Sequence, residues 1–426
     1  MKKIHYAWIV LFLSFIALLS AQGVRLSFGA FVSPWEIDFS TSRAIVSLIA
    51  FVSYLVYGLS QPYIGRLIDT YGVRMILSFS ILLIGVTTIL TYFATNPWQL
   101  IIIYGVISSI GFGGASNVAG SIIVANWFSE KRGFALGLMS AGTAVGQLLL
   151  VPFSLYLISH FGWKNTVLIL GFFLVFVIFP IIFFFIRNFP ADKGIEAYGN
   201  IETHQKKLAT KEETPSTTPK HLSIIQLLKN KAFLFLLLPF FVCGVTTSGL
   251  MDTHLIPFAQ VCGFSPAVTG TAVSLLAGFN IAGTIFSGYL ADRLNPKYIL
   301  TILYGSRALT IVLLILISSD QHLFQFAITQ SHLLIIFAIT FGIVDFATVA
   351  PTIKLATTYF KHLSVGGVIG WLFLSHQVGS ALGAYIPGVL FDLTGGYNIS
   401  FVLSICLLVV ASIFSYLLPN VVTTKD

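Results

Sequence analysis

The sequence predicts an all-α membrane protein, with twelve transmembrane helices in two pseudo-symmetric six-helix bundles. Three observations predict this class: the scarcity of charge, a series of long apolar runs, and one polar segment that divides those runs equally. Of the 426 residues, 56% are hydrophobic and only 9% are charged, whereas a soluble protein carries about 25% charged residues. The composition therefore excludes a soluble multidomain protein, and its hydrophobicity excludes a disordered chain.

Two further classes are excluded by the cysteines and by the placement of charge. Cys243, Cys262 and Cys406 are too scattered to form a disulfide framework. The formal charge of +8 would suit a nucleic-acid-binding protein if the basic residues shared a soluble face, but they flank apolar runs instead. We therefore expect a lipid bilayer, and no nucleic acid, as a partner of this chain.

The apolar runs have the length of membrane-spanning helices. A helix needs about 20 apolar residues to cross a hydrocarbon core about 30 Å thick. Twelve runs meet this condition, at roughly 7–32, 44–64, 75–94, 99–126, 134–158, 164–186, 232–256, 267–290, 298–318, 326–352, 366–390 and 397–418. They lack the two-residue alternation of barrel strands. The first run lacks a small-residue cleavage site, so we read it as a retained helix and not as a signal peptide.

One polar segment divides the runs six and six. It is rich in Lys, Glu, Pro, Ser and Thr, a linker composition that cannot bury a core. We therefore expect an N-terminal bundle at 1–187, a cytoplasmic linker at 188–231 and a C-terminal bundle at 232–426.

The basic residues predict the orientation, because Lys and Arg accumulate in cytoplasmic loops. With a cytoplasmic N-terminus, nineteen Lys and Arg residues lie on the cytoplasmic side and only Arg43 and Lys164 lie opposite. We therefore expect a multi-pass protein of the plasma (inner) membrane with both termini in the cytoplasm.

The two halves carry matching sequences, which indicates an internal duplication. The loop after the second helix reads Gly65-Arg66-Leu67-Ile68-Asp69 in the first half and Gly288-Tyr289-Leu290-Ala291-Asp292 in the second, 223 residues later. Further on, Ala144-Val145-Gly146 aligns with Gln377-Val378-Gly379 at an offset of 233. Halves of equal topology can rock against each other around a site at their interface.

These motifs carry a family resemblance. The Gly65-x-x-x-Asp69-x-x-Gly72-x-Arg74 loop, with its second copy at Gly288-x-x-x-Asp292-Arg293, resembles the signature loop of the major facilitator superfamily. The stretch from Trp127 to Gly146, together with Trp8, resembles the monocarboxylate transporter branch. The resemblance implies a transporter that works by alternating access, with a small-molecule substrate and protons as its partners; we expect it to be monomeric and to need no cofactor.

Five charged residues of the signature loops are candidates for a cytoplasmic gate. An Asp at a helix end, with a basic residue five positions on, can hold a gate through charge pairs and a helix N-terminus. The alternative is that these charges are merely solvated and set the topology. The gate candidates are Asp69, Arg74, Asp292, Arg293 and Lys297.

Asp345 and Arg307 are the candidates for proton coupling. An ionisable group in hydrocarbon costs about 2.5–3.5 kcal/mol on insertion scales, so both should face protein or water. Counted from Lys354 and Lys297, taken as the cytoplasmic ends of their helices, each lies about 15 Å into the membrane. An Asp that pairs with Arg when ionised, and separates from it when protonated, is a coupling switch. The alternative is a static structural ion pair.

The other polar residues inside the predicted helices are candidates for substrate binding. Arg25 suits an anionic substrate. The alternative role for its side chain is to extend to the membrane surface. Asp252 and His254 occupy nearly the symmetry-related place, and a lone His is as often an interior hydrogen-bonding residue. The alternative for the others is packing or bonding to a neighbouring helix. The candidates are Arg25, Asp252, His254, Asn280, His376 and Gln377.

One departure limits the branch resemblance. Monocarboxylate carriers place an Asp and an Arg within helix 8, whereas Thr269 to Leu290 contains no charge. The leading hypothesis is a proton-coupled secondary active transporter of a small organic solute, a carboxylate or other organic anion. The alternatives are an efflux pump for amphipathic compounds and a siderophore or polycarboxylate transporter of the same superfamily. No Walker motif and no nucleophile–base pair is present, so we expect neither an ATPase nor another enzyme.

Overall fold

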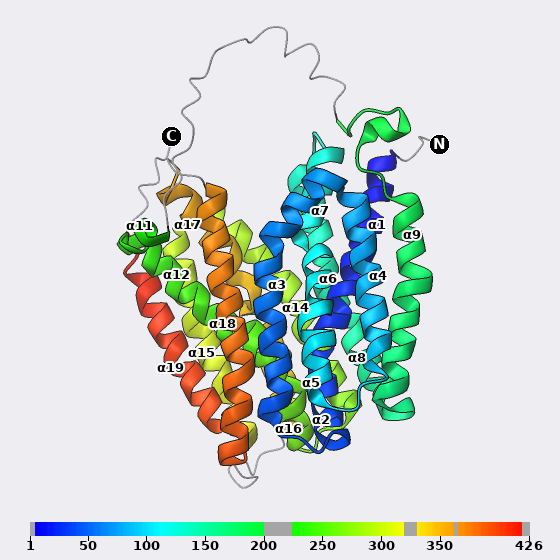
Figure 1. Ribbon diagram of the computed structural model, residues 1–426. Coiled ribbons are helices and arrows are strands. Elements are labelled where there is room, and N and C mark those ends of the chain that lie inside the picture. Colours follow the sequence, from blue (N-terminus) through cyan, green and yellow to red (C-terminus); the bar gives the residue numbers. More distant parts are fainter. Residues whose placement is uncertain (1–4, 200–223, 319–329, 362–364, 420–426) are drawn as a thin grey trace.

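The computed structural model describes residues 5–199, 224–318, 330–361 and 365–419, and these residues fold into two helical bundles side by side (Figure 1). The Lys-rich part of the predicted linker, 200–223, lies outside the described residues. The first bundle comprises α1 (Tyr6–Leu26), α2 (Phe28–Asp38), α3 (Arg43–Tyr71), α4 (Val73–Thr91), α5 (Pro97–Leu100), η1 (Ile101–Ser108), α6 (Ser109–Gly114), α7 (Asn117–Trp127), α8 (Arg132–Phe173), η2 (Leu174–Ile178) and α9 (Phe179–Phe185). It is followed by η3 (Pro190–Lys193) and, after the gap, by α11 (Ile224–Leu228).

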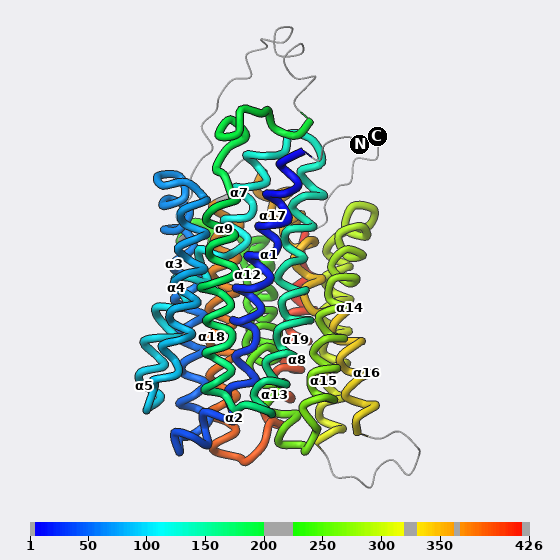
Figure 2. The backbone as a smooth tube through the Cα atoms, turned by 90° about the vertical axis from the view of Figure 1, so that its right-hand side faces the viewer, coloured from blue at the N-terminus to red at the C-terminus, as the bar shows by residue number. Residues whose placement is uncertain are grey.

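The second bundle repeats this order of helices. It comprises α12 (Lys231–Gly244), η5 (Val245–Met251), α13 (Asp252–Val261), α14 (Pro266–Arg293), α15 (Pro296–Ser318), α16 (Gln330–Val344), η6 (Phe346–Thr348), α17 (Val349–Tyr359), α18 (Val365–Thr394) and α19 (Asn398–Tyr416). Both bundles are visible from a second direction in Figure 2.

The helices of the described residues account for twelve membrane crossings. Within the described residues, ten helical stretches are long and apolar enough to span a membrane. One of them, Arg132–Phe185, contains two arms that turn at Gly162, where φ is 75°. The 30-residue α18 adds the twelfth crossing. The predicted fold class is therefore confirmed.

One predicted run ends too early. The sequence predicts a run at 326–352 with Lys354 at its cytoplasmic end, but α17 continues to Tyr359. The Lys354 ammonium donates to the Ala291 carbonyl at 2.7 Å and to the Asp292 carboxylate at 2.8 Å. Because these partners satisfy the ammonium, α17 can continue past Lys354. Asp345 therefore lies deeper below the end of its helix than the sequence estimate placed it.

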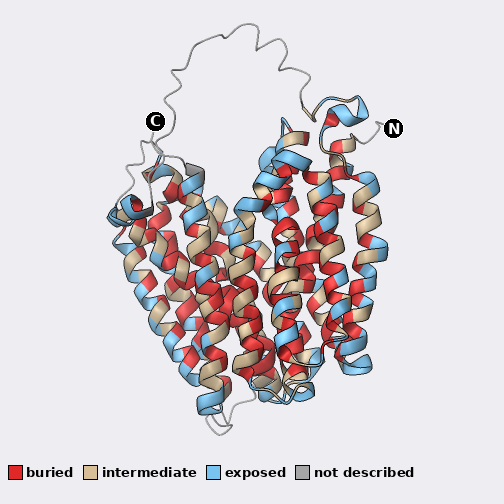
Figure 3. Cartoon of the chain, viewed as in Figure 1, coloured by how far each residue is buried: buried red, intermediate tan, exposed pale blue. Residues whose placement is uncertain are grey.

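Buried residues lie inside the bundles and exposed residues lie on their outer faces (Figure 3). Apolar side chains fill the interior of each bundle, and many large ones also remain on the outside, such as Phe12 at 61% and Leu309 at 73% exposure. Such a surface would be unstable in water but is compatible with hydrocarbon. Many Phe residues belong to this outer surface.

The two halves converge at one end. We call the side where α1 begins and α19 ends the terminal side, and the opposite one the far side. In Figure 1 the ribbons of the two halves diverge towards the terminal side, at the top, and converge towards the far side. The halves meet where α3 packs on α18, α8 on α14 and α2 on α13.

The internal repeat is visible in matching close approaches of helix backbones. A Cβ at Gly146 of α8 would collide with the Leu19 carbonyl of α1, and a Cβ at Gly379 of α18 would collide with the Phe241 carbonyl of α12. The two glycines are those that the sequence aligned. In both halves, therefore, a glycine lets the first and fifth helices come into backbone contact.

We expect Gly146→Val to lower the stability of the detergent-solubilised protein by about 1–3 kcal/mol, because the new side chain has no space against α1. The midpoint of thermal unfolding measures this. Gly137→Val is the matched control, since no atom lies within 4 Å of a Cβ added there. Equal midpoints for the two variants would contradict the packing role of Gly146.

Candidate functional site

Arg25 is a cation on the first half with few bonds of its own. It lies at the end of α1, just before the break at Ser27, and is partly buried. Its guanidinium lies over the rings of Tyr57 at 4.1 Å and Tyr54 at 4.9 Å, and Nη1 donates to Gln22 Oε1 at 3.3 Å. Among the described residues no carboxylate lies within 4.0 Å of it. Most of its five N–H donors are therefore available to a ligand.

Asp252 lies at the related position on the second half. It is the first residue of α13, directly after the π-helical segment η5, and it is partly buried. Its Oδ1 accepts a hydrogen bond from Gln147 Nε2 of α8 at 3.1 Å. A cavity of about 10 Å³, bounded also by Leu26, adjoins this contact and has room for about one water molecule.

A second bond joins the halves beside Arg25. The Tyr54 hydroxyl of α3 donates to the Ser248 carbonyl in η5 at 2.6 Å. The tyrosine that supports the guanidinium thus also contacts the second half. Arg25 and Asp252 therefore belong to one site at the interface of the two halves, with opposite charges that form no direct ion pair.

Arg307 and Asp345 meet, but not as the sequence suggested. The helix containing Asp345 breaks there, between α16 and η6, with ψ of −81°. Arg307 Nη2 donates to the main-chain carbonyls of Val344, at 2.6 Å, and of Asp345. Arg307 is fully buried at 0% exposure, and its bonds satisfy carbonyls that the broken helix leaves without partners. In this conformation it supports the main chain.

The Asp345 carboxylate bonds elsewhere within the second half. Its Oδ2 accepts from Asn280 Nδ2 of α14 at 3.1 Å, and Asn280 Oδ1 accepts from Thr284 at 3.1 Å. Oδ1 has no hydrogen-bond partner among the described residues, and Asp345 is 2% exposed. Asn280 thus contacts the coupling candidate and is itself buried, at 6% exposure.

Both ring nitrogens of His254 have protein partners. Nδ1 lies 3.0 Å from the Tyr397 hydroxyl and Nε2 lies 2.7 Å from the Ala384 carbonyl, and the ring is buried. The structure therefore separates His254 from Asp252 and places it with residues near the far side of the second half.

His376 and Gln377 have different surroundings. His376 is buried, with its ring 4.9 Å from that of Phe240, and its Nε2 has no hydrogen-bond partner among the described residues. Gln377 faces α3, because a Cβ added at Gly58 of α3 would lie 2.8 Å from the Cβ of Gln377. Gln377 is thus at the interface of the halves, and His376 lies inside the second half.

The gate candidates make their contacts within single halves. Arg74 Nε donates to the Phe183 carbonyl at 2.8 Å. Asp292 pairs with Lys354 at 2.8 Å, and Lys297 Nζ donates to the Leu418 carbonyl at 3.2 Å. The Arg293 guanidinium lies over the ring of Tyr289 at 4.2 Å. Asp69 is exposed. These contacts agree with the divergence of the halves on the terminal side, where a closed gate would need contacts between halves.

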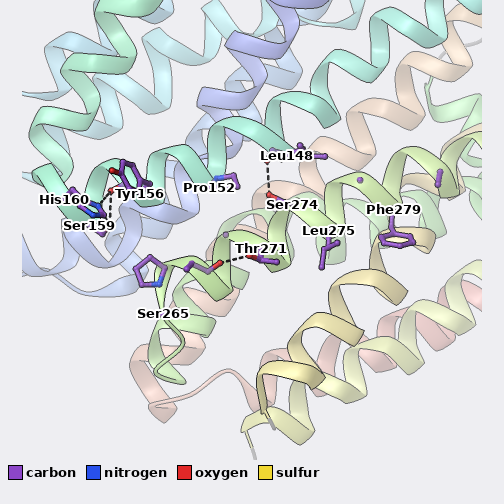
Figure 4. Close-up of a pocket in the computed structure, with 15 residues that line it drawn as sticks. Leu148, Pro152, Tyr156, Ser159, His160, Ser265, Thr271, Ser274, Leu275 and Phe279 are labelled. Carbon is purple, nitrogen blue, oxygen red and sulfur yellow. Dashed lines mark hydrogen bonds between the residues drawn. The ribbon is translucent and has the colours of Figure 1, made fainter. Parts of the chain in front are cut away.

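A larger cavity lies apart from these charges, between α8 and α14 (Figure 4). Its volume is about 980 Å³. The side chains of Ser159 and His160 lie at one end, and apolar residues such as Leu275 and Phe279 lie towards the other. None of the predicted site residues lines it.

Sequence reasoning missed several polar residues. Gln22 and Gln147 are uncharged and stand in apolar helices, so charge counting passed over them. Glu36, Arg43 and Asp392 lie between the predicted runs and Tyr397 begins the last one, yet the four residues form a dense cluster on the far side. A signal was present for Arg43, because it is one of only two basic residues assigned to that side.

Two six-helix halves with a charged site at their interface define a membrane transporter. The profile of the Major Facilitator Superfamily matches residues 10–350, which is more than half of the chain. The chain therefore belongs to the Major Facilitator Superfamily. The expectations that it is a transporter and not an enzyme are confirmed by this membership.

Relatives extend over nearly the whole chain. It is 26% identical to the uncharacterized MFS-type transporter YcxA of Bacillus subtilis (strain 168), over 95% of this chain and 92% of that protein. It is 24% identical to monocarboxylate transporter 13 of Rattus norvegicus, over 97% and 89%, and to monocarboxylate transporter 12 of Homo sapiens, over 93% and 77%. The resemblance to the monocarboxylate transporter branch is thus confirmed.

A solved structure shares the fold. It is a bacterial homologue of the human lysosomal transporter Spinster in an inward-facing, unoccupied conformation, with a TM-score of 0.72 and 17% sequence identity over 98% of this chain and 97% of that one. At this identity the likeness concerns the fold alone.

Proposed function

We propose that the protein is a secondary active transporter that moves a small organic anion together with a proton by alternating access. The observation that carries the proposal is Arg25, a partly buried guanidinium at the interface of the halves, most of whose donors have no partner in the described part of the chain. Carboxylates bind guanidinium groups through charge-assisted, often bidentate hydrogen bonds. The likeness to monocarboxylate transporters 12 and 13 supports a carboxylate as the anion.

The charges of the site explain why an anion would bring a proton. With the site empty, Arg25 and an ionised Asp252 balance each other at the interface. An anion on Arg25 would leave the site with a net negative charge in poorly hydrated surroundings, which is unfavourable. Protonation of Asp252 removes that charge, so anion and proton bind favourably together.

Two acids compete for the coupling role. Asp252 is only partly buried, lies at the same interface as Arg25 and bonds to Gln147 of the other half, so its protonation can respond both to substrate and to movement of the halves. Asp345, which the sequence favoured together with Arg307, bonds to Asn280 within the second half. The geometry favours Asp252, and Asp345 is the alternative that paired variants test.

The orientation follows from the basic residues. We place both termini in the cytoplasm, because Lys and Arg accumulate in cytoplasmic loops. The membrane is then the plasma membrane, which in a bacterium is the inner membrane. We propose that the protein works there as a monomer. The terminal side is then cytoplasmic, and this conformation, which is open on the terminal side, faces inwards.

A thermal-shift screen tests this function, because a ligand stabilises the state that binds it. The panel contains monocarboxylates, dicarboxylates, siderophore-like polycarboxylates, amino acids and drugs. We expect carboxylates to raise the unfolding midpoint, and to raise it more at pH 5.5 than at pH 7.5, because anion binding takes up a proton. Stabilisation that is equal at both pH values would argue against proton coupling.

The cavity between α8 and α14 favours a second candidate, transport of amphipathic compounds. It combines a long apolar wall with a polar end, which suits an amphiphile. The same screen distinguishes the two candidates. If amphipathic drugs stabilise the protein through this cavity, their effect persists in Arg25→Gln and is lost in Gly278→Leu, which narrows the cavity. This result would support the second candidate over the first.

A further inference from the structure

We propose that Asp392 and the N-terminus of α3 form a reversible latch that closes the transporter on the far side, with Arg43 as its positioning residue. The far-side latch comprises Glu36, Arg43, Asp392 and Tyr397. The proposal rests on the alternating access proposed above, but its test reads distances and needs neither a substrate nor a proton gradient.

The central contact joins a carboxylate of the second half to a helix end of the first. Asp392 lies near the end of α18, and its Oδ1 and Oδ2 accept from the backbone N–H groups of Arg43 at 3.1 Å and Ala44 at 2.8 Å. These are the first two residues of α3, whose amides have no partner within the helix. The helix dipole also favours a negative charge there. The Asp392 carboxylate thus caps the N-terminus of α3, a helix of the other half.

Arg43 is held between the two halves. Its Nε and Nη2 donate to the two Glu36 carboxylate oxygens at 2.6 and 2.8 Å, within the first half. Its Nη1 donates to the Tyr397 hydroxyl of the second half at 3.0 Å, and its guanidinium lies 3.9 Å from the centre of the Phe391 ring. Arg43 is 5% exposed, so these contacts fix the first turn of α3 against the second half.

Tyr397 extends the contact into the second half. Its hydroxyl lies 3.0 Å from His254 Nδ1, and His254 bonds in turn to the Ala384 carbonyl of α18. The latch therefore connects α2 and α3 of the first half with α13, α18 and the start of α19. Rotation that opens the far side must break the bonds of Asp392 and the bond of Arg43 to Tyr397.

The exposure of Asp392 makes this contact reversible. Asp392 is exposed to solvent, while Arg43 and Tyr397 are buried. An exposed carboxylate is rehydrated when its partners leave, so its release is less costly than separation of a buried ion pair. Arg43 keeps Glu36 as its partner in either conformation, because both belong to the first half.

Distances between pairs of spin labels, measured by double electron–electron resonance in lipid nanodiscs, test the proposal. One pair, Phe93→Cys and Ile399→Cys, spans the far side, and the other, Tyr71→Cys and Leu294→Cys, spans the terminal side; all four residues are exposed. The background carries Cys262→Ser and Cys406→Ser, and the buried Cys243 is retained. We expect Asp392→Ala to lengthen the far-side distance and shorten the terminal-side one, with a change of about tenfold or more in the ratio of the two populations.

Two further variants keep the test decisive. Tyr397→Phe removes the hydroxyl that accepts from Arg43 and preserves ring packing, so it should shift the populations in the same direction. Asp392→Glu should restore the distances of the parent protein, which a loss of folding would not allow. The control is Lys164→Gln, because Lys164 pairs with Asp38 within the first half at 3.4 Å. Distance distributions that are unchanged in both Asp392→Ala and Tyr397→Phe would overturn the proposal.

Discussion

Replacing Asp252 by Asn is expected to abolish accumulation of the substrate anion driven by a pH gradient, while counterflow exchange persists. Asn keeps the size of the side chain and its contact with Gln147, but it can neither carry a proton nor balance Arg25 when the site is empty. The site is then permanently ready for the anion, with no proton linked to binding. Uptake into proteoliposomes, with and without an imposed pH gradient, measures both activities.

The matched variants are Asp345→Asn and Asp38→Asn. Asp345→Asn removes the other acid inside the second half, and we expect it to retain gradient-driven accumulation. Asp38 is an exposed carboxylate paired with Lys164, and its replacement should change neither activity. If accumulation is lost in Asp345→Asn and retained in Asp252→Asn, the coupling acid is Asp345 and our assignment of Asp252 is wrong.

Replacing Arg25 by Gln is expected to weaken binding of an anionic substrate about 10- to 100-fold. The loss corresponds to a charge-assisted hydrogen bond, about 1.5–3 kcal/mol. A neutral amide analogue of the same substrate should lose little, because it makes no ion pair with the guanidinium. Binding isotherms for the carboxylate and its amide, in the parent and the variant, measure the difference.

Arg25→Lys and Arg66→Gln complete this series. Lys keeps the charge but not the planar fork that binds a carboxylate bidentately, so its affinity should fall between those of the parent and Arg25→Gln. Arg66 is an exposed cation on α3, and removing it should leave both affinities unchanged. Equal losses for the acid and its amide in Arg25→Gln would show that Arg25 does not bind the anion.

Much of the architecture could be predicted from the sequence, because the membrane permits few alternatives. Backbone polar groups in hydrocarbon must be satisfied within a helix, so a long apolar run already determines a spanning element. The duplicated loops and the aligned Gly146 and Gly379 indicated two equivalent halves, and both glycines make the same close approach in the structure. The main error concerned the end of α17, where Lys354 was read as the helix boundary.

The site was predicted only in part, since sequence shows which residues are costly to bury but not what each one faces. Arg25 and Asp252 were recognised by their charge, and the structure brings both to the interface of the halves. Arg307 was expected to pair with the Asp345 carboxylate, but it bonds to the carbonyls at a helix break. No local pattern revealed that break, so this role of Arg307 could not be read from the sequence.

The sequence by itself determined that this protein is surrounded by lipid, which segments form its helices, that its halves are duplicated, and which few charges lie within the membrane. These properties depend on composition and on spacing along the chain, which are local. Only the tertiary structure decided the partners of those charges: Gln147 for Asp252, the tyrosine rings for Arg25, and the first turn of α3 for Asp392. The physical reason is that each partner belongs to the other half or to another helix, and helix packing, which no local pattern records, brings them together.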